Sequence, residues 1–138
     1  MGTCIFVASG LDFDVDAYFP GSPFKGQIAT VFRKGQILPT RDNPQKIPRP
    51  GSGFVHMVSA TQEPHLKCQI APALEFLSKY EKEFACLKRM GVDNMLLDFG
   101  MEGQQTIERA QYLPPELIVA LSRYHMGLVF STVRIPCG

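Results

Sequence analysis

The 138-residue sequence lacks several features that mark particular classes of protein. It has no tryptophan, no C-x-x-C pair and no apolar run long enough to cross a membrane. Its formal net charge of +1 gives no reason to expect a nucleic-acid or membrane-surface partner. A composition of 45% hydrophobic and 20% charged residues is instead ordinary for a globular protein, so we expect one domain over residues 1–138.

The four cysteines, Cys4, Cys68, Cys86 and Cys137, have no histidine at ligand spacing, which argues against a zinc site. Reduced thiols are favoured, although a bridge between Cys4 and Cys137 stays open if the termini meet. Met1–Val7 lacks a basic start, and its apolar run is too short for a signal peptide. We therefore expect a cytoplasmic protein.

Motifs that would hold a phosphate or a metal are also missing. No G-x-x-x-x-G-K-[ST] phosphate loop occurs. Asp12, Asp14 and Asp16 have the spacing that opens a calcium loop, but Ala17 replaces its glycine and Pro23 replaces its glutamate. These acids are more typical of the start of a short helix, and we expect neither metal nor cofactor.

The most informative stretch of the chain is residues 66–90. Its apolar residues recur at steps of three, four and seven, which predicts one long amphipathic helix of about 35 Å. Pro64 suits the first turn, and Gly91 suits the residue after the last turn. Pro72 predicts a kink unless the helix starts late. The apolar positions are Leu66, Ile70, Leu74, Leu77, Phe84 and Leu87.

The other apolar runs are short and rich in β-branched residues, which predicts strands. Pro114-Pro115-Glu116 predicts the start of a helix that Gly127 stops. The expected order is β-α-β-β-α-β-α-β, an α+β fold with a mainly antiparallel sheet and both larger helices on one face. The predicted strands are Thr3–Ala8, Gln27–Phe32, Phe54–Ala60, Val92–Gly100 and Leu128–Ile135, with a short helix within Leu11–Phe19.

Alternation along the third strand predicts that Phe54, His56 and Val58 face one way and Val55, Met57 and Ser59 face the other. Catalytic signals are weak. A small enzyme could use Asp98 or Glu102 at a strand end, or Cys68 near a helix start, together with a histidine. No flanking motif supports such a site at the three histidines, His56, His65 and His125.

Several fragments occur together in an order that resembles a known family. They are Phe13-Asp14-Val15-Asp16, Gly21-Ser22-Pro23, Arg33-Lys34-Gly35, Ser52-Gly53-Phe54, Val58-Ser59, Gln69-Ile70, Leu97-Asp98-Phe99-Gly100 and Leu113-Pro114-Pro115-Glu116-Leu117. The set resembles a bacterial family of small uncharacterised α+β domains, some of which look like immunity proteins that accompany polymorphic toxins. The resemblance implies a non-catalytic protein that neutralises a cognate toxin by direct binding, and it supplies no catalytic residues.

The expected contact regions are two charged segments. The loop from Leu38 to Gly53 is rich in proline and carries Arg41, Lys46 and Arg49. Residues 102–109 carry Glu102, Glu108 and Arg109. A small enzyme and a homo-oligomeric structural module remain the alternatives to a toxin-binding protein.

Overall fold

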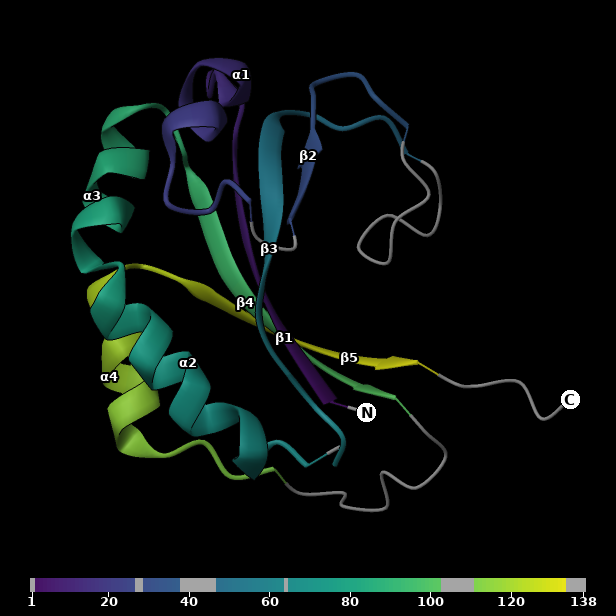
Figure 1. The fold of residues 1–138 in the computed structure, drawn as a ribbon, viewed down its shortest axis with the longest axis vertical. Helices are drawn as coiled ribbons and strands as arrows, with labels where there is room; N and C mark the ends of the chain where they lie inside the picture. Colours follow the sequence, from purple (N-terminus) through teal and green to yellow (C-terminus); the bar gives the residue numbers. More distant parts are fainter. Residues whose placement is uncertain (1, 27–28, 38–46, 64, 103–110, 134–138) are drawn as a thin grey trace, which may run out of the picture.

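A five-stranded mixed sheet in the order β2-β3-β1-β4-β5 forms the centre of the structure. This computed structural model describes residues 2–26, 29–37, 47–63, 65–102 and 111–133. Strand β1 is central and runs antiparallel to β3 and β4; β2 is antiparallel to β3, whereas β5 is parallel to β4 (Figure 1). The strands are β1 (Gly2–Gly10), β2 (Ala29–Phe32), β3 (Ser52–Thr61), β4 (Asn94–Glu102) and β5 (Gly127–Val133).

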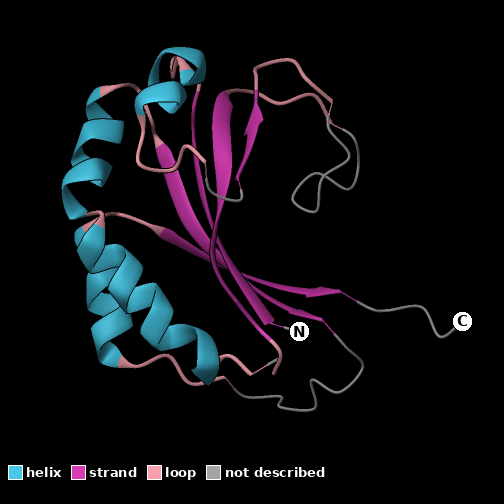
Figure 2. Cartoon of the chain, viewed as in Figure 1, coloured by secondary structure: helices cyan, strands magenta, loops and turns pink. Residues whose placement is uncertain are grey.

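The described helices all lie on one face of this sheet (Figure 2). Because α4 carries the chain back between β4 and β5, these two strands pair in parallel. The α+β class is therefore confirmed, but the sheet is mixed. The helices are α1 (Val15–Tyr18), the 3₁₀ turn η1 (Phe19–Gly21), α2 (Lys67–Lys79), α3 (Glu81–Arg89) and α4 (Pro115–Arg123). None of the described helices is long and apolar enough to cross a membrane.

The single long helix expected over residues 66–90 is wrong. The helix is interrupted at Tyr80, whose φ of −106° and ψ of 22° lie outside helical values. The Tyr80 ring packs 5.0 Å from the rings of both Phe24 and Phe76, which holds this residue against the core. Helix α2 instead continues through Pro72, where the kink was expected. Aromatic packing, rather than the proline, thus sets the point at which the helix ends.

The two helix ends that precede β4 and β5 are built differently. Gly91 follows α3 with a φ of +102°, as its position predicted. After α4 the left-handed residue is His125, with a φ of 54°, and not a glycine. The amide of Met126 donates to the carbonyl of Leu121 at 2.9 Å, which closes the turn. Gly127, expected to stop the helix, is already the first residue of β5.

Phenylalanine side chains fill the space between the sheet and the helices. Phe6, on the central strand, is fully buried. Its ring centroid lies 5.3–6.0 Å from four others, those of Phe24, Phe54, Phe76 and Phe84. The rings come from two strands, two helices and the segment before β2, so one cluster joins most elements of the fold.

A bulge in β3 changes which side chains face the helices. The pairing with β1 shifts by one residue, which leaves Val58 without a partner of its own. After the bulge Ser59 points towards α2, where its hydroxyl donates to the Gln69 carbonyl oxygen. The expectation that Ser59 faces away from His56 and Val58 is therefore wrong, because strict alternation ends at the bulge.

Candidate functional site

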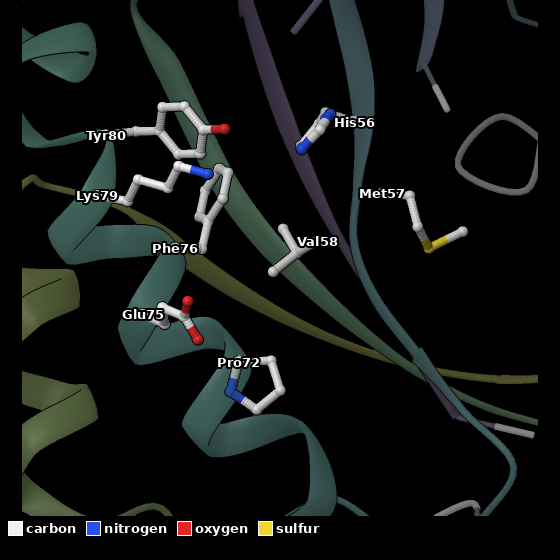
Figure 3. A pocket seen from close by; sticks show the side chains of 8 residues that line it. All are labelled: His56, Met57, Val58, Pro72, Glu75, Phe76, Lys79 and Tyr80. Carbon is white, nitrogen blue, oxygen red and sulfur yellow. The ribbon is translucent and has the colours of Figure 1, made fainter. Parts of the chain in front are cut away.

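A groove with a volume of about 210 Å³ lies between α2 and β3 (Figure 3). The two elements run in opposite directions: the start of α2 lies beside Thr61, and its end lies beside His56. The described residues that line the groove are His56, Met57 and Val58 from β3, Pro72, Glu75, Phe76 and Lys79 from α2, and Tyr80.

The inner end of the groove is aromatic. The ring of His56 extends from β3 towards Phe76 and Tyr80 (Figure 3) and is 2% exposed. It lies nearly parallel to the Phe76 ring, with 5.7 Å between centroids and an angle of 22°, and 4.8 Å from the ring of Phe24. This packing fixes the imidazole and places a polar group in apolar surroundings.

His56 is held there in its neutral form. Burial lowers the pKa of its imidazole below the ordinary value of 6.5, because the charged form would lose its hydration. Its Nδ1 atom is buried and has no hydrogen-bond partner among the described residues. A buried ring nitrogen without a partner is costly to the fold.

The titration of His56 makes a testable contribution to stability. With a folded-state pKa below that of the unfolded chain, stability is full above pH 6.5 and falls as the pH drops below it. We expect His56→Phe to flatten this loss between pH 7 and pH 5, measured by urea unfolding. His125→Asn, at an exposed histidine, should keep the wild-type slope. Equal slopes in wild type and His56→Phe would contradict the assignment.

The outer wall of the groove carries one charge of each sign. Glu75 and Lys79 are both exposed and lie one turn apart on α2. The Lys79 ammonium lies 5.3 Å from the centroid of the Tyr80 ring, which draws it towards the inner end. The groove therefore presents its positive charge near His56 and its negative charge nearer Pro72.

The opposite wall is the edge of β3. The Met57 side chain points away from α2, on the far side of the strand (Figure 3), so the groove meets this residue at its main chain. Strand β2 pairs with β3 only from Gly53 to His56. From Met57 onward, none of the described strands pairs with β3 on this side.

Asp98 does not contribute to this groove. It lies on the face of the sheet away from the helices, since Leu97 and Phe99 on either side of it belong to the core. It is 4% exposed and accepts hydrogen bonds from the Ser131 hydroxyl at 2.8 and 2.9 Å. His56 faces the helices, so the sheet separates these two residues. Burial, with the Asp98 charge nearby, raises the pKa of the Cys4 thiol far above its usual range, which disfavours the reactive thiolate at neutral pH.

Cys68 is also far from His56. It lies in the first turn of α2, where its thiol donates to the Glu63 carboxylate at 3.6 Å. The Phe76 ring that stacks on His56 is eight residues further along α2, about 12 Å of helix. Of the residues named for an enzyme, Asp98 and Cys68 are thus not brought together with His56. His65 stands three residues before Cys68, and its carbonyl oxygen accepts a hydrogen bond from the Cys68 amide at 3.0 Å. The side chain of Glu102 lies outside the described residues.

Of the residues expected to bind a partner, only Arg49 is described at the level of its side chain. Its guanidinium carbon lies 4.4 Å above the Phe32 ring, and its main chain exchanges hydrogen bonds with Gly35 and Gln36. Arg49 thus packs against the fold as well as carrying charge. Ser52 and Gly53, expected in the same loop, belong to β3. Arg41, Lys46, Glu108 and Arg109 lie outside the described residues.

The acids near the N-terminus have local partners. Asp14, one of the three acids expected at the start of a short helix, caps α1 by accepting a hydrogen bond from the Ala17 amide at 3.1 Å. Asp16 forms an ion pair with Arg33 at 2.6 Å. No group of three or more His, Cys, Asp or Glu side chains suited to a metal occurs within the described parts of the chain.

The groove could not be predicted from the sequence, because two of the features that form it depend on tertiary structure. Nothing local reveals that β2 is shorter than β3, or that α2 ends at Tyr80. Comparison with known proteins found no significant match to any family model, curated protein or solved structure.

Proposed function

We propose that this chain is a non-catalytic binding protein of the immunity type, which neutralises a cognate bacterial toxin by direct contact. The observation that carries the proposal is the groove beside the part of β3 that has no pairing partner on this side among the described strands. A strand edge presents main-chain donors and acceptors that pair readily with another chain. An apolar floor with a charged wall adds specificity to such pairing.

The positions of the potentially reactive side chains also favour binding over catalysis. Asp98 and His56 lie on opposite faces of the sheet, and Cys68 is about two helical turns away from the ring that stacks on His56. A general acid or base must lie within hydrogen-bond reach of its partner, directly or through one water. The groove is better suited to recognition than to chemistry.

The test uses the protein encoded beside this gene. Co-production of the two should restore growth that the neighbour alone inhibits, and the mixture should elute as one complex in size-exclusion chromatography with light scattering. Cys68→Ser should protect equally, because protection by binding needs no nucleophile. An unrelated toxin serves as the control. Absence of both protection and complex formation, or protection that Cys68→Ser abolishes without weakening the complex, would overturn the proposal.

A further inference from the structure

The unpaired stretch of β3 has the length of a short strand. From Met57 to Thr61 it pairs with β1 on one side only, within the described residues. Five residues of β-strand span roughly 17 Å. Because successive residues direct their N–H and C=O groups to alternate sides, two or three of them offer these groups outward. An added strand could therefore form about four hydrogen bonds there.

A buried polar network holds this stretch rigid. Gln69 of α2 is 1% exposed and accepts from the Ser59 hydroxyl. Its amide nitrogen donates to the Thr61 hydroxyl at 2.6 Å, and Thr61 donates to the Glu63 carbonyl at 2.8 Å. These hydrogen bonds connect β3 to α2 in the part of β3 that follows His56, its last residue paired with β2. The edge is therefore preorganised, which reduces the entropy lost when another strand pairs with it.

The volume of the groove limits what it can hold. Pockets for cofactors and drug-sized ligands occupy about 300–1,000 Å³. At about 210 Å³ this one is too small for that class, and it suits one or two side chains of a peptide. Val58, Pro72 and Phe76 give it an apolar floor beside the strand edge. Size and lining thus favour an aliphatic side chain carried by an extended chain.

We propose that an extended segment of the toxin partner adds to the sheet as a sixth strand along Met57–Thr61, antiparallel to β3, and places an aliphatic side chain in the groove. The proposal rests on the proposed function. The antiparallel direction continues that of β2, which ends its pairing with β3 at His56.

The two charged side chains of α2 that line the groove, Glu75 and Lys79, determine which charges the bound segment should carry at each end. An antiparallel segment enters beside Thr61 and leaves towards His56, so its later residues approach Lys79 and its earlier ones approach Glu75. The segment therefore carries a basic residue before the aliphatic one, and an acidic side chain or a terminal carboxylate after it. A segment of opposite charge order would meet like charges at both positions.

The experiment is hydrogen–deuterium exchange of this chain, free and mixed with the purified protein encoded beside its gene. We expect amide exchange within residues 57–61 to slow on binding. Lys79→Glu should weaken the complex at least about tenfold, since it reverses a charge on the groove. Lys82→Glu is the matched control, because Lys82 is exposed on α3 and does not line the groove; it should bind within about twofold of wild type.

The outcomes separate this inference from the proposed function. A complex that forms without protection of residues 57–61, with Lys79→Glu binding like Lys82→Glu, would overturn strand addition and leave toxin binding intact. Absence of any complex would overturn the proposed function itself. A free chain that is already dimeric, with residues 57–61 protected before the partner is added, would assign the edge to a second copy and overturn the inference. Melting temperatures of both variants will show that each is folded.

Discussion

Phe6→Ala should lower the free energy of unfolding by about 3–5 kcal/mol, the range for removing a buried aromatic ring. Phe6 is fully buried on the central strand, and its ring lies within 6.0 Å of four other phenylalanine rings. Those rings come from separate elements, so the space left behind cannot close by moving one of them. Urea unfolding followed by circular dichroism measures the change.

Phe130→Ala is the matched control for this prediction. The same atoms are removed, but the Phe130 side chain is 43% exposed and contacts only the Phe99 ring among the aromatic pairs of the described residues, at 6.2 Å. We expect a loss of about 1 kcal/mol or less. Similar losses in the two variants would mean that Phe6 is not at the centre of the core.

Local pattern was sufficient to predict most of the elements. Short apolar runs predicted all five strands. A helix start among Asp12, Asp14 and Asp16 and a helix end at Gly91 were predicted because both roles depend on nearest neighbours. The break at Tyr80 could not be predicted, since it depends on Phe24, more than fifty residues away in sequence. Apolar periodicity over residues 66–90 continues through the break and therefore concealed it.

The candidate site was predicted less well than the fold. His56 was identified as a strand residue of uncertain direction, and only the surrounding rings decide that it is buried. The groove depends on a difference in length between β2 and β3 and on the bulge at Val58. Charge in a proline-rich loop directed attention to Arg49, whose guanidinium packs on Phe32. Sequence charge therefore predicts exposure poorly where an aromatic side chain is near.

The bulge and the groove have a common origin in β3. Before Val58, β3 directs Phe54 and His56 into the aromatic core; after it, Ser59 and Thr61 meet the polar Gln69. The strand thus changes from apolar to polar contacts with α2 just beyond His56, the last residue of β3 that pairs with β2. Without the bulge, Ser59 would face the uncovered side of the sheet, and Gln69 would be buried without one of its partners.

Gly10→Ala should be the most damaging of the small substitutions, with an expected loss of about 3 kcal/mol or more. A Cβ at Gly10 would lie 2.0 Å from the carbonyl oxygen of Gly91, in the turn between α3 and β4. The same Cβ would lie 3.0 Å from the carbonyl carbon of Gly91 and 3.1 Å from the Cα of Val92, so the close contacts are all with main-chain atoms. The hydrogen bond from the Asp93 amide to the Ser9 carbonyl oxygen, at 3.0 Å, holds the turn in place, so it cannot withdraw without losing this bond.

Gly21→Ala is the control for that substitution. A Cβ at Gly21 meets no atom within 4 Å, and its φ is not positive, so alanine fits without strain. We expect a change within about 0.5 kcal/mol, as for other surface substitutions. Thermal and urea unfolding of both variants provide the measurement. If Gly10→Ala unfolds like Gly21→Ala, the turn at Gly91 yields without cost, and the close contact between the end of β1 and this turn does not constrain the fold.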